Sequence, residues 1–277
     1  MSTEMPTEAV MYPFKRFLPA PLYYLVRGIR AAGVGFCFAG FWGGSVLICW
    51  LLLPFLWLWP GDRPTKLHRV NRFVRGAFHL FHFTMKTLRL YHRRTDASAL
   101  RADGIPASQP CVIVSNHPTL CDVTSISSLF PNIVAIARPS LANNPLLRPL
   151  VRAMGYIPVG IHMLRDAEAR LNMGFDVLIF PEGTRTPLGG PLHPFHRGAF
   201  ELAARAKVPI VLVTLTCVPP ALTKRLPIWK HPDHMAVNTV TPFGSIVPSA
   251  PSRETARVVE QRYRDVLGYS AEAGGAS

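Results

Sequence analysis

A long apolar run near the N-terminus dominates the hydrophobic pattern. No charged residue lies between Ala31 and Trp59. As one helix this run would measure ~44 Å at about 1.5 Å per residue, more than the roughly 30 Å hydrocarbon layer of a bilayer. Because Gly43–Gly44 lies mid-run and Pro54 interrupts the second half, we predict two shorter helices joined near the glycines. Residues 31–60 are therefore interpreted as an apolar membrane hairpin, with a single span or a buried core hairpin as alternatives.

Basic residues flank the apolar run on both sides. The N-terminal segment, 1–30, is basic and ends with Arg27 and Arg30, and four cations follow the run: Arg63, Lys66, Arg69 and Arg72. Cytoplasmic segments of membrane proteins carry an excess of Lys and Arg, so both ends are expected on the cytoplasmic side. This charge pattern favours a hairpin over a span. It predicts a location on the cytoplasmic face of a membrane.

The segment over 61–95 has a helical period. Its apolar residues recur every three or four positions from Val70 to Leu88, and basic residues follow the same step from Arg72 to Arg93. This pattern predicts a basic amphipathic helix. Such a helix can lie on anionic lipid with its apolar face down. Alternatively, it packs on the rest of the protein and leaves its basic face in solvent.

From Cys111 the pattern changes to short apolar strands that alternate with helices. Strands are expected at Cys111–Ser115, Ile133–Ala137, Tyr156–Val159, Asp176–Phe180, Ile210–Thr216 and His234–Val240. Helices are expected near Thr119–Leu129, Asn144–Met154, Met163–Met173, Arg197–Ala206 and Ser252–Leu267. This alternation predicts an α/β fold with a mostly parallel sheet flanked by helices. We assign it to a domain over 105–268 and expect a disordered tail over 269–277.

Composition narrows the class of protein. The chain has 277 residues, of which 49% are hydrophobic and 17% charged, and this excludes an intrinsically disordered protein. The net charge of +14 favours an anionic partner, such as a membrane surface, a phosphorylated substrate or a nucleic acid. The basic residues gather around the apolar run and no nucleic-acid-binding motif is visible, so nucleic acid is not expected as a partner. The five cysteines have neither zinc-site nor disulfide-framework spacing.

The first candidate for chemistry follows the first of these strands. His117 is placed in the turn from strand to helix, and Asp122 lies five residues further on. This spacing lets the carboxylate accept a hydrogen bond from the imidazole Nδ1–H, which leaves the other ring nitrogen to take up a proton. The pair is thus a candidate general base and its orienting acid. Alternatively, Thr119 and Asp122 match a helix capping box, in which the carboxylate only satisfies backbone N–H groups.

A second cluster follows the strand that ends at Phe180. A turn at Gly183 would expose backbone N–H groups, Thr184 adds a hydroxyl, and Arg185 can bind a phosphate with two parallel hydrogen bonds. Glu182 could accept from a substrate hydroxyl or hold the arginine. Arg138 ends another strand and would face the same crevice. The alternative is an ordinary Pro-Glu-Gly turn and a surface arginine.

Three motifs occur in a fixed order: Asn116-His117-x4-Asp122, Phe180-Pro181-Glu182-Gly183-Thr184-Arg185 and Val208-Pro209-Ile210. Together they resemble the motifs of the lysophospholipid acyltransferase family, which includes the 1-acylglycerol-3-phosphate acyltransferases. The resemblance covers about 111–243. It implies that His117 is the base and Asp122 its orienting acid. It implies acceptor binding by Arg138, Glu182, Gly183, Thr184 and Arg185.

The resemblance also implies an activity for the domain over 105–268, which would be the catalytic domain. A membrane-associated enzyme of this family moves a fatty acyl group from acyl-CoA or acyl carrier protein to the hydroxyl of a lysophospholipid such as 1-acylglycerol-3-phosphate. The expected partners are the lipid membrane, the lysophospholipid and the acyl carrier. No metal and no prosthetic cofactor are expected. The apolar hairpin is similar to the membrane-dipping two-helix element of bacterial members.

Three alternatives to this interpretation stay open. The acceptor could be a different lipid or an aryl-polyene-type molecule, because 116–159 looks most like bacterial relatives of uncertain acceptor, some of them associated with aryl-polyene-type lipid synthesis. A covalent route could pass through Cys121 or Ser115. The chain could also be a non-catalytic protein that binds lipid or tethers to a membrane.

Overall fold

The structure is a computed structural model that describes residues 11–95, 109–188, 190–224, 226–249 and 251–269. Predictions for 1–10, for 105–108 and for the tail after 269 lie outside the described residues. The N-terminal part consists of the 3-10 helix η1 (Pro13–Arg16), α2 (Ala20–Leu47), the π-helical turn η2 (Ile48–Leu52), α3 (Leu53–Leu58) and α4 (Arg63–Thr87).

Within the described residues, the remainder of the chain is built on a seven-stranded sheet with the order β1-β7-β6-β2-β5-β3-β4. The strands are β1 (Tyr91–Thr95), β2 (Val112–Ser115), β3 (Ile133–Ala137), β4 (Ile157–Pro158), β5 (Asp176–Ile179), β6 (Ile210–Val218) and β7 (Ala236–Ile246). Strands β6 and β7 are antiparallel, and the other neighbouring pairs are parallel. The predicted mostly parallel sheet is confirmed.

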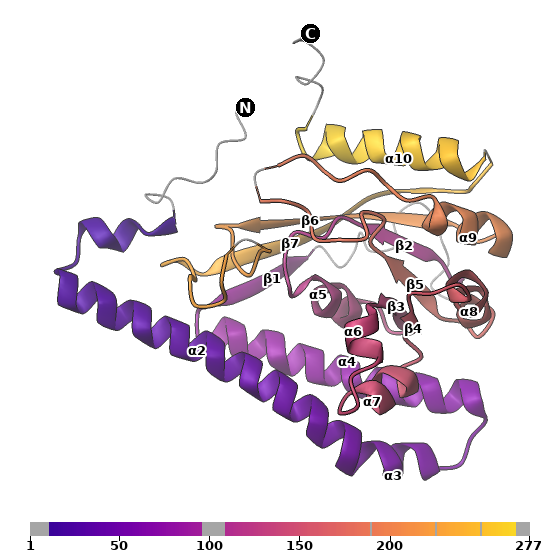
Figure 1. Cartoon of the computed structure of the whole chain (residues 1–277), viewed down its shortest axis with the longest axis horizontal. Helices are drawn as coiled ribbons and strands as arrows, with labels where there is room; N and C mark the ends of the chain where they lie inside the picture. Colours follow the sequence, from indigo (N-terminus) through magenta and orange to yellow (C-terminus); the bar gives the residue numbers. More distant parts are fainter. Residues whose placement is uncertain (1–10, 96–108, 189, 225, 250, 270–277) are drawn as a thin grey trace, which may run out of the picture.

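Helices cover both faces of this sheet (Figure 1). They are α5 (Asp122–Leu129), α6 (Pro139–Ala142), α7 (Arg148–Ala153), α8 (Met163–Leu171), α9 (Gly198–Ala206) and α10 (Ser252–Val266). On one face, α4 contacts α5 and α7, and on the other, α9 contacts α8 and α10. Every residue of the central strands β2 and β5 is buried, as expected for a parallel sheet that is covered on both sides.

The first strand of the sheet was not predicted. Residues 61–95 were expected to be one helix, but α4 ends at Thr87 and β1 begins at Tyr91. Arg89 adopts a left-handed backbone conformation with φ of 53°, which stops the helix. Leu90 and Tyr91 are buried in an apolar cluster with side chains of α2 and α4. These two residues fitted the helical period, but in the structure they lie at the start of a strand.

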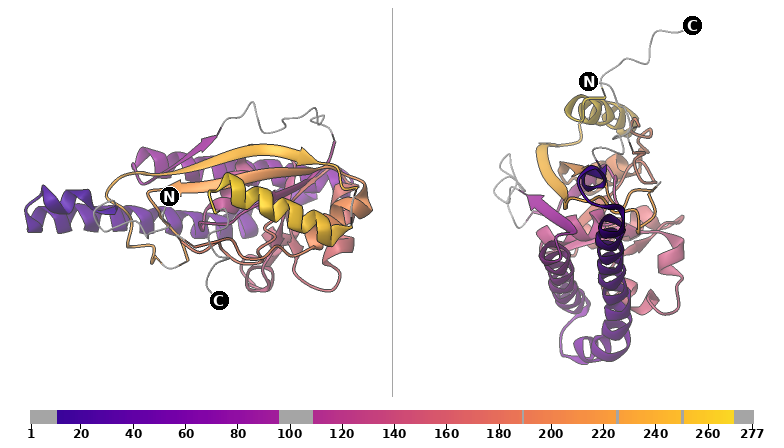
Figure 2. Two further views of the ribbon diagram at one scale, coloured as in Figure 1. Left: turned by 90° about the horizontal axis from the view of Figure 1, so that it is seen from above. Right: turned by 90° about the vertical axis from the view of Figure 1, so that its left-hand side faces the viewer.

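The apolar run does not turn at Gly43–Gly44 as predicted. Helix α2 passes through both glycines, and the irregularity falls at η2, just before Pro54. Proline removes one helical hydrogen bond and its ring clashes with the carbonyl of the residue four positions earlier, which explains a widened turn at this place. A glycine costs only about 1 kcal/mol in a helix. The chain reverses instead at 59–62, so that α4 lies beside α2 (Figure 2).

Helix α4 packs on the protein through the face that was expected to be its apolar one. Its buried side chains include Val70, Val74, Phe78, Phe81 and Met85. Part of its basic side is also engaged, since Arg75 Nε donates to the Ser128 carbonyl of α5 at 2.9 Å. Of the two alternatives for this helix, the structure therefore favours packing against the α/β domain.

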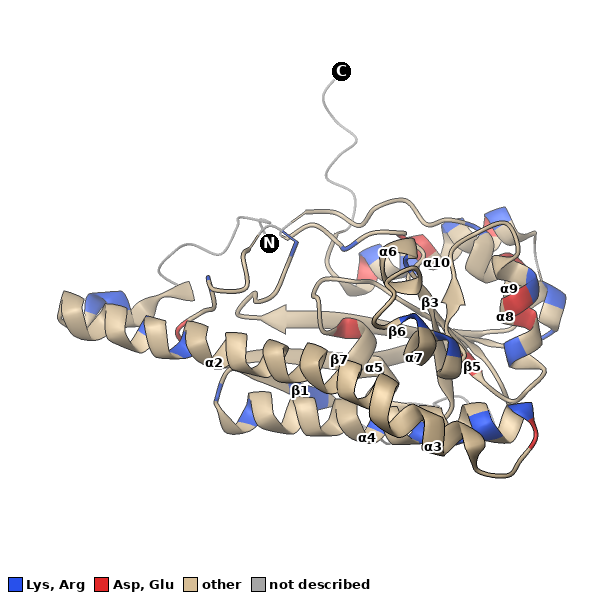
Figure 3. Ribbon diagram, turned by 60° about the horizontal axis from the view of Figure 1, so that its bottom comes forward, with Lys and Arg blue, Asp and Glu red and all other residues tan. Residues whose placement is uncertain are grey.

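The outer surface of the N-terminal helices is apolar. Among the described residues, one continuous helix, Ala20–Leu58, is long and apolar enough to cross a membrane, and 17% of its most apolar window is buried. Figure 3 shows that α2 and α3 carry charged residues only toward the start of α2. Large exposed side chains follow the helices: Phe36, Trp42, Leu47, Trp50, Phe55, Leu58 and Trp59, with Leu80 and Phe83 on α4. Monomeric proteins in water rarely expose so large an apolar surface.

Helix α10 is held to the sheet by one buried hydroxyl, and this gives a stability prediction. Tyr263 Oη donates to the Val114 carbonyl of β2 at 2.6 Å and accepts from Val213 N–H of β6 at 3.0 Å. Tyr263→Phe leaves these buried groups unpaired, at a cost of about 1–3 kcal/mol. We expect thermal unfolding in detergent to shift down by about 2–4 °C per kcal/mol. Tyr24→Phe, at a side chain that is 66% exposed, is the control, and equal midpoints for the two variants would contradict the prediction.

Candidate active site

The site lies where the loops after β2 and β5 meet. These strands are neighbours and parallel, with Val114 paired to Ile179, so the segments that follow them leave the same edge of the sheet. His117 lies in the first loop, and its ring stacks on Phe180 of the second with centroids 4.2 Å apart. The functional side chains therefore gather at the carboxyl ends of the strands, as expected for an open α/β sheet.

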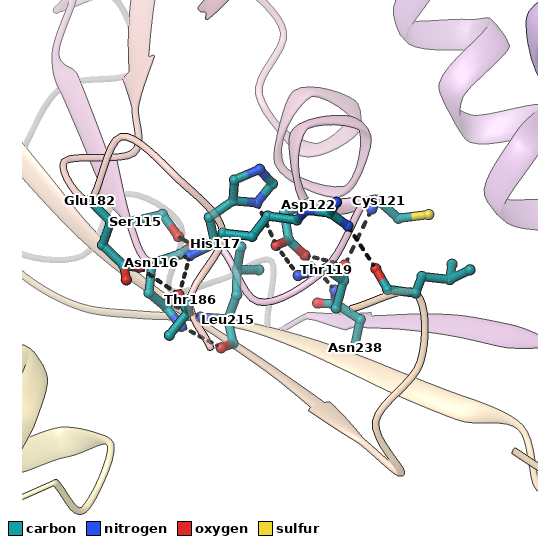
Figure 4. A network of polar contacts seen from close by, with 12 residues as sticks. Ser115, Asn116, His117, Thr119, Cys121, Asp122, Glu182, Thr186, Leu215 and Asn238 are labelled. Carbon is teal, nitrogen blue, oxygen red and sulfur yellow. Dashed lines mark hydrogen bonds and ion pairs between the residues drawn. The ribbon is translucent and has the colours of Figure 1, made fainter. Parts of the chain in front are cut away.

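His117 and Asp122 form the predicted pair. His117 Nδ1 lies 2.9 Å from Asp122 Oδ2, and Figure 4 shows the other ring nitrogen pointing away from the carboxylate. The imidazole is 13% exposed, whereas the carboxylate is completely buried. Among the described residues, no hydrogen bond to His117 Nε2 is present. An ionised carboxylate accepts from Nδ1–H, and this leaves Nε2 with a lone pair directed out of the protein.

The Asp122 carboxylate is held by further donors. Oδ2 also accepts from Thr119 N–H at 2.6 Å, and Oδ1 accepts from Thr119 Oγ1 at 2.5 Å and from Asn238 Nδ2 at 3.0 Å. The bond to Thr119 N–H is the one expected from the capping-box alternative. Helix α5 begins at Asp122 with Cys121 at its N-cap position, so Thr119 does not cap this helix. The carboxylate also accepts from the His117 and Asn238 side chains, so it does more than satisfy backbone N–H groups. This set of donors fixes the position and the plane of the carboxylate.

Glu182 connects the two loops. Its Oε1 accepts from Thr186 Oγ1 at 2.5 Å and from His117 N–H at 3.3 Å, and its Oε2 accepts from His193 N–H at 3.0 Å. Burial raises the pKa of the Glu182 carboxyl, and these hydrogen bonds partly offset the effect. The side chain is 3% exposed. Its contacts indicate that Glu182 positions the backbone of His117, while binding of an acceptor by Glu182 stays a prediction.

The predicted turn at Gly183 is present, but the Gly183 N–H is bonded within the turn and is not exposed for a ligand as expected. Gly183 has φ of 65°, and its N–H donates to the Phe180 carbonyl at 3.1 Å. A Cβ at this position would lie 3.4 Å from the His196 ring. Both the left-handed backbone and the close ring therefore favour glycine here.

Two arginines of the segments that follow β3 and β5 interact electrostatically with each other. Arg185 Nη1 donates to the Leu222 carbonyl at 3.4 Å. Burial lowers the pKa of the Arg185 guanidinium, and repulsion by Arg138 lowers it further, while Asp122 opposes the change. Arg138 caps α6 at the end of β3 and is exposed. A bound anion would relieve the repulsion between these two cations, and anion binding by them stays a prediction. Thr184 Oγ1 accepts from Lys224 Nζ at 3.2 Å, which brings a third cation near.

The two candidate nucleophiles of a covalent route are poorly placed. Cys121 and Ser115 are both buried. Burial raises the pKa of the Cys121 thiol well above its ordinary value, and the nearby Asp122 charge raises it further. Ser115 Oγ donates to the neighbouring Asn116 carbonyl at 3.0 Å. A thiolate is disfavoured at Cys121, so these contacts favour direct transfer.

Three residues of the site were missed as functional candidates. Asn116 binds β6 through two bonds, donating to the Leu215 carbonyl at 2.8 Å and accepting from its N–H at 2.7 Å. Asn238 of β7 and Tyr91 of β1 lie behind Asp122, and Asn238 Nδ2 also donates to Tyr91 Oη. Asn116 stood beside His117 in the motif and was thus open to prediction. Asn238 and Tyr91 come from distant strands, with no local signal.

Comparisons with known proteins agree with the geometry. A family model described as "Acyltransferase" matches residues 99–216. A chloroplastic 1-acyl-sn-glycerol-3-phosphate acyltransferase of Brassica napus is 29% identical over 197 residues, which cover 67% of this chain and 53% of the relative. The human 1-acyl-sn-glycerol-3-phosphate acyltransferase alpha is 36% identical over 124 residues, 42% of this chain and 44% of that protein. The chain thus spans about half the length of these curated relatives.

A solved structure has the same fold. The 1-acyl-sn-glycerophosphate acyltransferase PlsC of Thermotoga maritima superposes with a TM-score of 0.67 at 18% identity, covering 92% of this chain and 99% of that one. At this identity the likeness speaks for the fold alone. The family model spans the motifs around His117 and Glu182, and over this region the chain is similar to 1-acyl-sn-glycerol-3-phosphate acyltransferases.

Proposed function

We propose that the protein is an O-acyltransferase that moves a fatty acyl group from an acyl thioester to the hydroxyl of a lysophospholipid with a phosphate head group. The acyl carrier is CoA or acyl carrier protein, and 1-acylglycerol-3-phosphate is the proposed acceptor. The observation that carries this proposal is the 2.9 Å contact of His117 Nδ1 with Asp122. It leaves Nε2 able to take the proton of an alcohol, and Arg185 and Arg138, which interact electrostatically with each other, are proposed to bind the phosphate of the same molecule.

In the proposed reaction the acceptor and the thioester react directly. His117 Nε2 takes the proton of the acceptor hydroxyl as its oxygen attacks the thioester carbonyl carbon. The tetrahedral intermediate then collapses, the carbon–sulfur bond breaks, and the imidazolium returns the proton to the departing thiolate. General base assistance of this kind contributes about 10²–10⁴-fold, and the Asp122 charge stabilises the imidazolium that forms. Alignment of two bound substrates contributes more, up to roughly 7–11 kcal/mol.

The head group is proposed to bind at Arg185 and Arg138, and this gives a prediction. Arg185→Gln removes a charged donor whose hydrogen bond is worth about 1.5–3 kcal/mol. We expect the KM for 1-acylglycerol-3-phosphate to rise roughly 10- to 100-fold while kcat falls less. The measurement is steady-state acyl transfer in bilayers, with a monoacylglycerol without phosphate as second acceptor. Arg152→Gln, at an exposed arginine of α7, is the control. Equal losses on both acceptors would contradict phosphate binding by Arg185.

The apolar outer surface of α2 and α3 is proposed to lie in a bilayer. The exposed aromatic and aliphatic side chains of these helices would enter the lipid, and the cations around them would meet anionic head groups. We propose the cytoplasmic face of the inner membrane, with both ends of the hairpin on that side. A lysophospholipid would then reach the crevice without leaving the membrane.

The proposed function is tested with the full chain in phospholipid vesicles. Acyl-CoA and acyl carrier protein, each with a radiolabelled chain, are offered together with 1-acylglycerol-3-phosphate, other lysophospholipids or no acceptor. Labelled diacylglycerol phosphate that depends strictly on the acceptor supports the proposal. Turnover on a different lipid alone would overturn the acceptor assignment. Absence of turnover on every acceptor would favour a protein that binds lipid without catalysis.

A further inference from the structure

A small cavity lies between η1, the start of α2 and the segment that joins β6 to β7. Figure 1 shows η1 and the start of α2 at the end of the molecule opposite α8 and α9. Its volume is about 140 Å³, whereas one water needs only about 10–15 Å³, so it has room for a small anion. It is lined by Tyr12, Lys15, Tyr23, Tyr24, Arg27 and Lys230. No carboxylate is among these described residues, and none of them belongs to the site around His117.

The central cation of this cavity has a fixed position. The Arg27 guanidinium lies over the Tyr12 ring, 4.3 Å from its centroid, and Nη1 donates to Tyr23 Oη at 3.2 Å. Tyr23 is only 4% exposed, so the phenol cannot move away with the arginine. A guanidinium held in place by two rings loses little conformational freedom when it binds an anion.

The walls of the cavity are also fixed to each other. Phe14 N–H donates to Asp233 Oδ2 at 3.0 Å, and Asp233 N–H donates to the Met11 carbonyl at 2.9 Å. Arg30 Nε of α2 donates to the Pro232 carbonyl at 3.1 Å. The segment with Lys230 is thereby attached to both η1 and α2. The lysine charges therefore stay near Arg27 although both lysines are exposed.

Exposed aromatic residues stand next to the cavity in the sequence. Phe17 follows η1 and is 80% exposed, and Trp229 precedes Lys230 and is 64% exposed. Aromatic rings beside cations are typical of the level in a membrane at which lipid head groups meet hydrocarbon. The apolar surface of α2 also begins at this end of the molecule. The position of the cavity is therefore consistent with binding of a lipid head group.

We propose that this cavity binds a phosphate group, at a second anion site separate from the acyl-transfer crevice. Arg27 provides a fork of donors, Lys15 and Lys230 provide charge, and the phenols provide hydroxyl donors, which together suit phosphate oxygens. The group comes from a phospholipid head group or from free phosphate. In the first case the site holds the start of α2 at the lipid surface.

The test compares two sets of paired substitutions in the full chain. Arg27→Gln with Lys230→Gln changes the cavity, and Arg253→Gln with Arg257→Gln removes the same charge from exposed positions of α10. Binding is measured to inorganic phosphate by calorimetry in detergent, and to phosphatidylcholine vesicles with or without phosphatidic acid by flotation. We expect the cavity pair to weaken binding of the phosphate-bearing probe roughly tenfold or more, and the α10 pair to leave it unchanged.

The outcomes distinguish the sources of the phosphate. Loss of phosphatidic acid binding with no measurable binding of inorganic phosphate identifies a lipid head group, and loss of both identifies the phosphate group itself. Lys230→Gln alone, at an exposed side chain, gives part of the loss without disturbing packing. Equal effects of the cavity pair and the α10 pair, or unchanged affinity in every variant, would overturn the proposal.

Discussion

His117→Ala is expected to lower kcat for acyl transfer by at least about 10²–10⁴-fold, the contribution of a positioned general base. The imidazole is partly exposed, and its Nδ1 is bound by Asp122, which is completely buried. Cys121 and Ser115 are buried, and Ser115 Oγ donates to the Asn116 carbonyl, so neither is well placed to act as the base. The measurement is single-turnover acyl transfer in bilayers with labelled donor and saturating acceptor.

The His117 prediction requires that the variant stays folded. The ring contributes a stack on Phe180 and one hydrogen bond to Asp122, so we expect a modest decrease of the unfolding midpoint. His162→Ala, at an exposed histidine that caps α8, is the matched control and should retain wild-type turnover. A His117→Ala enzyme that keeps more than roughly a tenth of kcat would exclude the base assignment, because less than the smallest general-base contribution would then be missing.

The sequence predicts the α/β part well because its signals are local. Strand Ile133–Ala137 is found at the predicted residues, since a short run of β-branched residues between polar turns has few other structures available. The pair His117–Asp122 is also local, with four residues between its members. Proximity in the chain combined with a strand-to-helix turn leaves little freedom, and the predicted contact is the observed one.

Features that depend on distant parts of the chain were not predictable in this way. Asn238 reaches Asp122 across 116 positions of sequence, because β7 reverses direction beside β6 and then accepts β1 as a parallel neighbour. The hydrophobic pattern of the β1 residues continued the period of the preceding helix, so the sequence did not indicate that a strand begins there. The turn of the apolar hairpin was also misplaced, because two glycines weaken a helix by about 1 kcal/mol each, too little to break it. Tertiary contacts decided both cases.

Asp122→Asn is expected to lower kcat by about 10²–10⁴-fold while the KM for the acceptor stays nearly constant. The carboxylate is completely buried and cannot touch substrate, so its loss acts through His117. In the wild type, four donors bond to the two oxygens of the carboxylate, whereas asparagine has only one acceptor oxygen. It also removes the charge that stabilises the imidazolium. In an unrelated Ser-His-Asp triad, the same exchange costs about 10⁴-fold.

Comparison of Asp122→Asn with Asp122→Ala separates chemistry from folding. Alanine leaves Thr119 N–H and Asn238 Nδ2 without their buried acceptor, at about 1–3 kcal/mol for each group, so the unfolding midpoint should fall clearly for alanine and less for asparagine. Both variants should lose kcat to a similar extent, because neither supplies a negative charge to the imidazolium. Asp166→Asn, at a half-exposed carboxylate of α8, should change neither quantity. The opposite outcome is that kcat follows the unfolding midpoint, so that the Asp122→Asn enzyme is nearly as active as the wild type. Asp122 would then be a capping residue of α5, and its charge would have no part in the reaction.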